Sequence, residues 1–141
     1  MISKETPGLF YFAYDLHLDR GRMAACCPTA KPRFSASLPN FQLIFAGWSR
    51  EWHGPVATIK RAGREKVLGG VYEIGETDLA KLDREHGFPA ASDRIKVTVF
   101  KDTGEAVEAF AYMAKQAGKA DKPSPDYLKI IQKGYIDWGL L

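Results

Sequence analysis

The sequence predicts an α+β domain: a small mixed, mainly antiparallel β-barrel of about six strands with two main helices packed outside it. Most of the chain consists of short apolar or alternating runs separated by polar segments with Gly or Pro, which is typical of strands joined by turns. Only two segments carry apolar residues at helical spacing. The 141 residues, of which 45% are hydrophobic and 26% charged, suit one globular domain, so residues 1–141 are expected to form a single unit.

Six runs are expected to be strands. They are residues 9–14, 41–48, 56–60, 66–74, 94–100 and 106–113. Residues 21–32 are expected to be loop with one helical turn. Turns at residues 62–64 and 102–104 create hairpins, so the sheet should be mainly antiparallel, and this number of strands permits partial closure into a barrel. The paired Gly69 and Gly70 indicate a bulge or a close backbone approach.

The first helix is expected to start near residue 76 and to stop near Gly87. Thr77 offers a capping hydroxyl beside two acidic residues of the first turn. Leu79 and Leu82 provide an apolar stripe at helical spacing. Gly87, with a proline beyond it, is a typical helix end.

The second helix is expected to begin at Pro125, with Ser124 as its cap. Proline is favoured in the first turn of a helix because the N–H that it lacks would have no acceptor within the helix there. Tyr127, Ile131 and Tyr135 then fall on one face, which should pack against the barrel.

Composition argues against several classes of partner. The net charge is only +3 and like charges form no block, which disfavours a nucleic-acid binder. No apolar run approaches the ~20 residues that a membrane span needs, and the first residues lack a signal-peptide pattern. Cys26 and Cys27 are adjacent and cannot staple distant segments, so a reducing, cytoplasmic location is expected, with one thiol buried and one partly exposed. The oligomeric state is left open.

Several short motifs, in a fixed order, resemble one known family. The chain contains YFAY, RMAACCP, FQLIFAGWS, GPVATI, VLGGVYEI, LDREHG, DRIKVTVF and KPSPDYLKIIQKGY. Their order and spacing resemble the γ-glutamylcyclotransferase-like (AIG2-like) family over residues 9–139. The resemblance implies a small barrel with a pocket at one end for a small-molecule substrate. It also implies that the substrate's α-amine attacks its own γ-carbonyl, forming 5-oxoproline and releasing an amine or amino acid, without a metal or organic cofactor.

The residues that this family uses for chemistry are replaced in this chain. In the family, the backbone amides of a loop reading YGSN or YGxN hold the γ-glutamyl group, and a Glu ending the motif LDxxEG moves the proton. The loop reads YDLH here, so Asp15 stands in place of Gly and His17 in place of Asn. The helix motif reads LDREHG, so His86 stands in place of the Glu. Glu85 comes one residue early, and one helical position rotates a side chain by about 100°, so it should point elsewhere.

A divergent enzyme is one interpretation of these changes. A neutral imidazole can remove a proton from an ammonium group, so His86 is the candidate proton acceptor. Backbone amides around Leu16 and His17 would then form the site for an anion or a carbonyl oxygen. Tyr14, at the start of the loop, and Tyr127, in the last helix, are candidate substrate contacts.

Asp15 is the change that most affects the choice of substrate. Glycine at this position lets backbone amides approach an anion closely. Two like charges ~4 Å apart at an effective dielectric of ~20 repel by about 4 kcal/mol, so an ordinary γ-glutamyl carboxylate should bind poorly. This repulsion is lost if Asp15 points into solvent or pairs with a cation, and a substrate with a positive group would meet Asp15 favourably.

Two alternatives stay open. One is a non-catalytic small-molecule-binding or regulatory protein that keeps the pocket without the reaction. The other is a site for a divalent transition metal on Asp15, His17 and His86, because two imidazoles and a carboxylate form a three-ligand set with an open position.

Four further residues have simpler expected roles. Trp48 and Trp52 are expected to cover the end of the barrel, with a place in the pocket wall as the alternative. His53 is expected to be exposed in its loop, and Arg94 to form an ion pair. Hydrolase and nucleotide-binding functions lack support, because the chain contains no GxSxG motif, phosphate loop or dinucleotide fingerprint.

Overall fold

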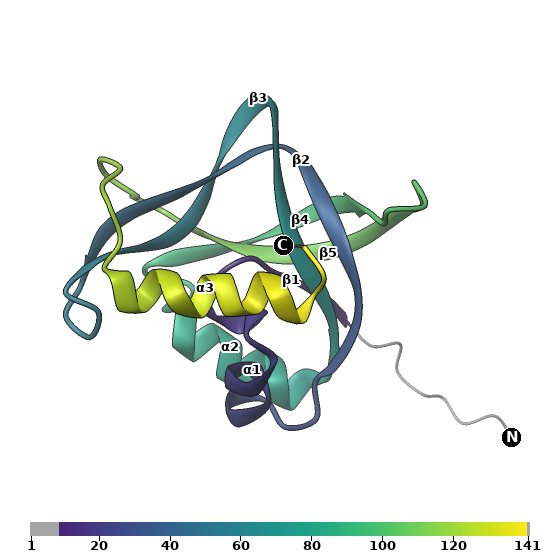
Figure 1. Ribbon diagram of the computed structural model, residues 1–141. Helices are drawn as coiled ribbons and strands as arrows, with labels where there is room; N and C mark the ends of the chain where they lie inside the picture. The colour runs from purple at the N-terminus through teal and green to yellow at the C-terminus, as the bar shows by residue number, and fades with distance from the viewer. Residues whose placement is uncertain (1–8, 141) are drawn as a thin grey trace, which may run out of the picture.

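Five strands form a closed barrel in the computed structural model, which describes residues 9–140 (Figure 1). They are β1 (Leu9–Ala13), β2 (Lys31–Ser49), β3 (Gly54–Ile74), β4 (Ser92–Phe100) and β5 (Ala106–Ala114). Their order around the barrel is β1-β3-β2-β4-β5. Neighbouring strands are antiparallel except β1 and β5, which run parallel and complete the circle. The predicted class, a small, mainly antiparallel barrel, is confirmed.

The count is five strands rather than about six because the third and fourth predicted strands are one. The predicted turn at residues 62–64 does not end β3. The pairing with β2 shifts instead from Pro39↔Lys66 to Phe41↔Arg61, so several residues of β3 bulge outward. Figure 1 shows β2 and β3 bending together at this point. A bulge of this kind turns a strand without breaking the sheet.

The second strand begins at Lys31 rather than at Phe41, so the loop predicted for residues 21–32 ends earlier, and residues 33–40, for which no strand was predicted, belong to β2. Ala36 and Leu38, two residues apart, both point into the core, and this two-residue period outweighs the prolines in the segment. Pro32 and Pro39 lie at the register shifts of β2, where a missing N–H does not interrupt a regular ladder.

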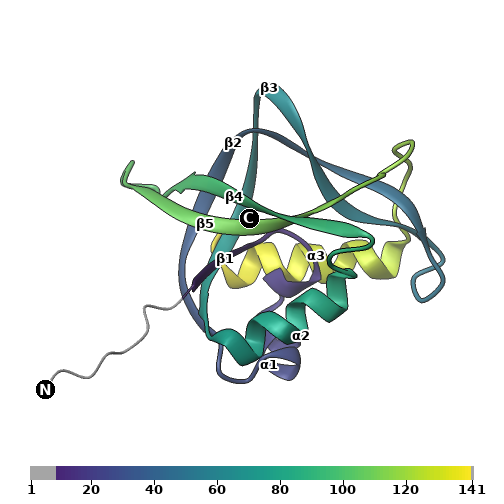
Figure 2. The same ribbon diagram turned by 180° about the vertical axis from the view of Figure 1, so that it is seen from behind.

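Three α-helices and one short 3-10 helix, η1 (Leu16–Leu18), complete the described fold. The α-helices are α1 (Arg20–Cys26), α2 (Glu76–His86) and α3 (Pro125–Asp137). Figures 1 and 2 show them gathered below the strands, beside β1. Of the helices in the described part of the chain, none has the length and apolar character to cross a membrane.

The helix ends follow the predicted signals with one correction. The Thr77 hydroxyl does not cap α2, because Asp78 Oδ2 accepts the Gly75 N–H at 3.2 Å instead. The helix ends at Gly87 as predicted, with a φ of 66° that suits glycine. At the start of α3, the Ser124 hydroxyl oxygen accepts the Tyr127 N–H at 3.3 Å, which confirms the predicted cap.

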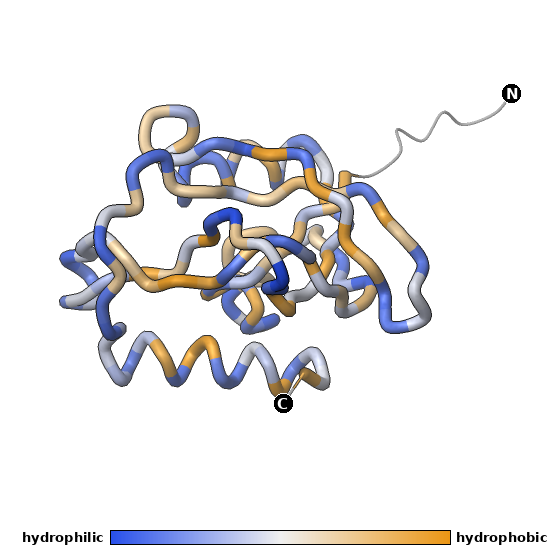
Figure 3. The backbone as a smooth tube through the Cα atoms, turned by 90° about the horizontal axis from the view of Figure 1, so that it is seen from above, coloured by the Kyte–Doolittle hydropathy of each residue, from blue (hydrophilic) through white to orange (hydrophobic). Residues whose placement is uncertain are grey.

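Side chains of β1 alternate between two hydrophobic clusters. Phe12 and Tyr14 belong to one cluster, with residues from all the other strands and α3. Tyr11 and Ala13 belong to the other, which includes residues of η1, α1 and α2. Figure 3 shows α3 along one side of the barrel, with hydrophobic and hydrophilic stretches in turn along it. Because β1 is anchored on both faces, the turn that follows it is held in a fixed position.

Gly69 and Gly70 mark a close approach and not a bulge, because the β2–β3 register is continuous there. A Cβ on Gly69 would collide with the Ala13 carbonyl oxygen and the Phe12 ring, and a Cβ on Gly70 would collide with the Trp138 ring. These glycines let β1 and the end of the chain pack directly on the β3 backbone.

The variant Gly69→Ala should lower the free energy of unfolding by about 1–3 kcal/mol, because the added methyl group meets backbone atoms that cannot move aside freely. Chemical denaturation measures this. Gly63→Ala is the matched control, since a Cβ there has nothing within 4 Å, and it should change stability by less than about 1 kcal/mol. Equal effects of the two variants would contradict the close approach.

Candidate active site

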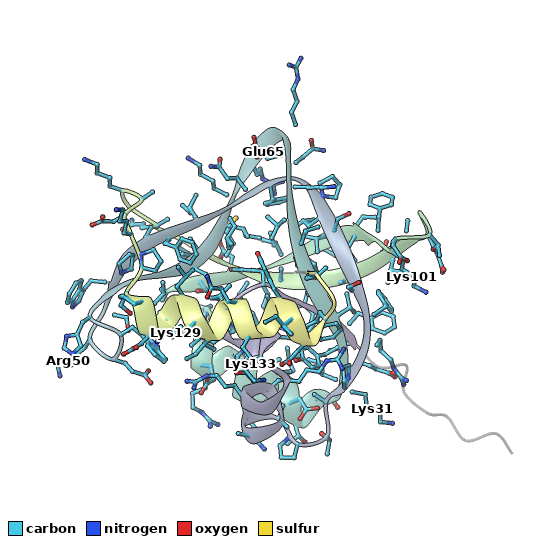
Figure 4. The ribbon with its side chains drawn as sticks, viewed as in Figure 1. Lys31, Arg50, Glu65, Lys101, Lys129 and Lys133 are labelled. Atoms are coloured by element: carbon cyan, nitrogen blue, oxygen red, sulfur yellow. The ribbon has the colours of Figure 1, made fainter. Side chains whose placement is uncertain are left out.

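A cavity of about 500 Å³ opens between the turn after β1, the end of α2 and the β2–β3 loop. The six residues proposed for the site from the sequence all line it: Tyr14, Asp15, Leu16, His17, His86 and Tyr127. No Lys or Arg stands among the described residues that line the cavity. The basic side chains labelled in Figure 4, such as Lys129 and Lys133 on α3, lie on the exposed outside of the molecule.

His86 is held from three sides at the end of α2. Its Nδ1 lies 3.0 Å from the Leu82 carbonyl oxygen, and its Nε2 lies 3.0 Å from Asp15 Oδ2. The ring stacks on Tyr112 with a centroid distance of 4.1 Å and an interplanar angle of 2°. A carbonyl oxygen can only accept, so Nδ1 carries a proton and Nε2 is the nitrogen that faces the cavity. The side chain is 14% exposed, which leaves little freedom for another ring position.

Asp15 turns back over its own loop. Its Oδ1 accepts the His17 N–H at 3.1 Å, which caps η1, while Oδ2 meets His86. Burial raises the pKa of the Asp15 carboxyl, but the hydrogen bond with His86 and the positive charges of His86 and His17 outweigh burial and hold that pKa well below its usual range. The carboxylate therefore stays charged. It accepts the His17 backbone N–H, which was expected to bind a ligand.

His17 lies between the cavity and the surface of α1. Its Nδ1 is 3.1 Å from the Tyr11 hydroxyl oxygen and 3.8 Å from Asp15 Oδ1, and its Nε2 is 3.6 Å from Glu85 Oε1. Burial lowers the pKa of His17, but the Cys26 and Glu85 side chains and the charge of Asp15 raise it to about 10. The negative groups around this imidazole make its position favourable for positive charge.

Tyr14 and Tyr127 form part of the cavity wall, and the hydroxyl groups of both are hydrogen-bonded to backbone atoms of the protein. Tyr14 donates to the Tyr112 carbonyl oxygen at 2.6 Å, and Tyr127 accepts the Ala57 N–H at 2.8 Å. Burial raises the pKa of both phenols, so they stay neutral. Leu16 is half-buried and packs against the core. These residues shape the cavity and contribute no charge to its wall.

The expectation that Trp48 covers the barrel end was wrong. It lies near the end of β2, is 72% exposed and lines the cavity. Trp52 is half-buried and packs edge-on against Tyr127, with ring centroids 5.5 Å apart. His53 is exposed as expected, and Arg94 pairs with Asp83 at 3.4 Å, also as expected.

Sequence reasoning missed three contributors to the site: Glu85, Tyr112 and Tyr11. Glu85 does point away from the place of His86, as its helical position predicts, but the same rotation brings it to the far nitrogen of His17. Tyr112 and Tyr11 come from strands and read in the sequence as core residues. The alternation of β5 could have placed Tyr112 on the face toward α2, but no motif marks its stacking on His86.

Two overlapping groups of side chains have the donor atoms of metal sites. In each group, ligand atoms lie within 4.8 Å of one another: one group is Asp15, His17 and His86, and the other is His17, Cys26 and Glu85. Cys26 is partly exposed and Cys27 buried, which confirms that expectation. His17 belongs to both groups and separates them.

Comparisons with known proteins agree with this architecture. The family described as "Gamma-glutamyl cyclotransferase, AIG2-like" matches residues 11–134. A gamma-glutamylcyclotransferase of Homo sapiens is 32% identical, over 96% of this chain and 74% of its own length, and one of Bos taurus is 30% identical, over 98% and 76%. A solved structure titled "Gamma-glutamyl cyclotransferase" superposes with a TM-score of 0.90 at 30% identity, over 94% of this chain and 81% of that one.

Proposed function

The chain belongs to the AIG2-like gamma-glutamyl cyclotransferase family, and we propose that it is a divergent member that cyclises a γ-glutamyl-type amide to 5-oxoproline. One observation carries the proposal: His86 closes α2 inside the cavity and faces the loop after β1. The family resemblance puts its catalytic Glu at this position. His86 is the proposed proton acceptor.

The reaction moves two protons off the attacking nitrogen. The substrate's α-ammonium gives the first proton to His86 Nε2, and the free amine nitrogen bonds to the γ-carbonyl carbon. The bond from that carbon to the leaving nitrogen then breaks as the leaving nitrogen takes that proton from His86. The second proton passes from the ring nitrogen to the released amine or to solvent, which leaves one hydrogen on the nitrogen of 5-oxoproline. Imidazole suits both steps because it accepts and donates protons near neutral pH. The stacking on Tyr112 and the bond to Leu82 hold the ring in one orientation throughout.

The Asp15–His86 hydrogen bond must open, and the Nε2 proton that makes it must leave to solvent, before His86 can accept another proton, because Nδ1 already carries one for Leu82. A substrate ammonium can replace it, since it offers protons to both the Asp15 carboxylate and the imidazole. Asp15 thus supplies the negative charge that the family Glu would supply from position 86. In this arrangement the carboxylate attracts the ammonium and the imidazole removes its proton.

The variant His86→Gln should lower kcat by about 10²–10⁴-fold with little change in KM, because glutamine keeps polar contacts but cannot accept a proton at this step. Release of 5-oxoproline from a panel of γ-glutamyl amides measures the rate. His53→Gln is the matched control, since His53 is exposed and outside the cavity wall. If His86→Gln turns over substrate at the rate of the unaltered protein, His86 is not the proton acceptor.

The charge of the cavity wall indicates which amides fit best. Three carboxylates line it, those of Asp15, Glu51 and Glu85, beside the imidazoles of His17 and His86 and with no lysine or arginine among its described residues. Trp48 and Trp52 lie along the same wall, and indole faces attract cations. A substrate whose leaving amine carries a second positive charge therefore gains attraction that an anionic amino-acid leaving group loses.

For a γ-glutamyl amide of a diamine, kcat/KM should exceed that of γ-glutamylglutamate by at least about tenfold at low ionic strength, and the ratio should fall as salt is added. Competition between the two substrates measures the ratio directly. Glu51→Gln should reduce it, because that side chain lines the cavity away from the Asp15–His86 pair. A preference for the anionic substrate would contradict the assignment.

A non-catalytic binding protein is the second candidate, and one observation favours it. The Asp15 carboxylate and the His17 amide satisfy each other, so the loop is complete without a ligand. In this case the fold keeps a pocket for a small molecule, and the reaction has been lost with the family residues.

The double variant Asp15→Gly with His86→Glu separates the two candidates. If the chain is a binding protein that lost only its chemistry, the double variant should release 5-oxoproline at least about 100-fold faster than the unaltered protein, because it regains the carboxylate base and a loop open to the substrate. If the chain is a divergent enzyme, the unaltered protein should already be active. A folded double variant that is as inert as the unaltered protein would contradict the divergent enzyme and would mean that the pocket itself has been reshaped.

A further inference from the structure

We propose that Asp15, His17 and His86 bind one divalent transition-metal ion of the zinc or ferrous type in the wall of the cavity. Their ligand atoms lie within 4.8 Å of one another, although the side chains come from the loop after β1 and from the end of α2. The inference rests on the geometry of these side chains and is independent of the proposed function.

His86 is oriented as metal-binding histidines usually are. Metal-bound imidazoles donate the N–H of their other nitrogen to a carbonyl or carboxylate, which fixes the ring and its tautomer. The Leu82 carbonyl oxygen plays this role for Nδ1 at 3.0 Å. The remaining nitrogen, Nε2, points at Asp15 Oδ2.

His17 shows the same division of its two nitrogens. Its Nε2 is 3.6 Å from the Glu85 carboxylate, slightly beyond hydrogen-bond length. Its Nδ1 has the Tyr11 hydroxyl at 3.1 Å and Asp15 Oδ1 behind it at 3.8 Å. Each imidazole thus has an oxygen acceptor near its outer nitrogen, while the Tyr11 hydroxyl would have to leave Nδ1 of His17 for an ion to bind there.

The separations of the inner atoms suit a common metal centre. Zinc–nitrogen and zinc–oxygen bonds of ~2.0–2.2 Å in a tetrahedron put neighbouring ligand atoms about 3.3 Å apart. The Asp15 carboxylate lies at such separations from both imidazoles, through different oxygens: Oδ2 is 3.0 Å from His86 Nε2, and Oδ1 is 3.8 Å from His17 Nδ1. Binding of one ion to all three residues would therefore require these side chains to rotate toward a common centre.

The ligand types restrict the ion. Two imidazole nitrogens, each of which must give up any proton it holds before it binds, and one carboxylate oxygen are typical of zinc and of non-haem iron sites with open positions, whereas calcium and magnesium prefer oxygen ligands alone. The carboxylate is buried beside the imidazoles, so a bound cation would neutralise it where water reaches it poorly. The open positions would face the cavity.

The ion would take the same Nε2 atom that proton transfer requires. Zinc should therefore inhibit any cyclisation, and a chelator should restore it. The second group, His17 with Cys26 and Glu85, uses a thiol and lies on the other side of His17, so it is a distinct position for an ion.

Metal analysis tests the inference without substrate. Chelator-treated protein is equilibrated with zinc, freed of unbound ion and analysed for metal, with about one zinc per chain expected. His86→Gln and Asp15→Asn should each weaken binding by at least about 100-fold, and Glu85→Gln by about 10-fold or more, as outer partners do. His53→Gln and Cys26→Ser are the controls that should keep full affinity. Circular dichroism confirms that each variant is folded.

Cobalt(II) in place of zinc gives a second readout. The visible bands of a four- or five-coordinate nitrogen and oxygen site should appear, without thiolate charge-transfer absorption, and they should persist in Cys26→Ser. The proposal is overturned by less than about 0.1 zinc per folded chain, by unchanged affinity in His86→Gln, or by loss of binding in Cys26→Ser alone. These measurements involve no turnover. Absence of metal binding would therefore not contradict the proposed cyclisation, and absence of cyclisation would not contradict the metal site.

Discussion

The hydrogen bond between Asp15 Oδ2 and His86 Nε2 joins two segments that are 71 residues apart in the chain. It fixes the loop after β1 against the end of α2, and the cavity lies where they meet. Both partners have further bonds, Asp15 to the His17 amide and His86 to the Leu82 carbonyl. Removing either side chain would leave the facing atom of the other, Asp15 Oδ2 or His86 Nε2, unpaired, at a cost of about 1–3 kcal/mol. The loop and the helix end are therefore one structural unit.

Much of the fold could be predicted because local signals agree with the tertiary structure. Gly87 and Ser124 mark helix ends by chemistry that depends on a few neighbouring residues. The first half of β2, residues 31–40, was not predicted as strand because its two prolines are local signals against one, whereas its pairing is set by distant residues of β3. Local sequence cannot show that a proline falls at a register shift.

The candidate site could be predicted in part for the same reason. The motifs around Asp15 and His86 locate these residues at the ends of a strand and a helix, and the family resemblance puts those ends together. Side-chain direction was not available from the motifs. Thus the motifs put Asp15 in the loop without fixing which histidine it bonds, and Glu85 was set aside although it lies beside His17. Tyr112 gave no signal, because a stacking partner needs only a flat ring on the right strand face.

Both proposals follow from one electrostatic demand. His86 Nε2 and Asp15 Oδ2 are 3.0 Å apart, and Nδ1 already holds its proton for Leu82, so the space between them requires a positive charge. In the resting protein a proton meets this need. A substrate ammonium meets it with several donors, and a divalent ion meets it by bonding to both atoms. A neutral or anionic ligand cannot supply this positive charge, so it must leave the Asp15–His86 hydrogen bond intact. Relative to the family pattern, the carboxylate at position 15 and the imidazole at position 86 therefore turn a site that receives an anion on backbone amides into one that selects among cations.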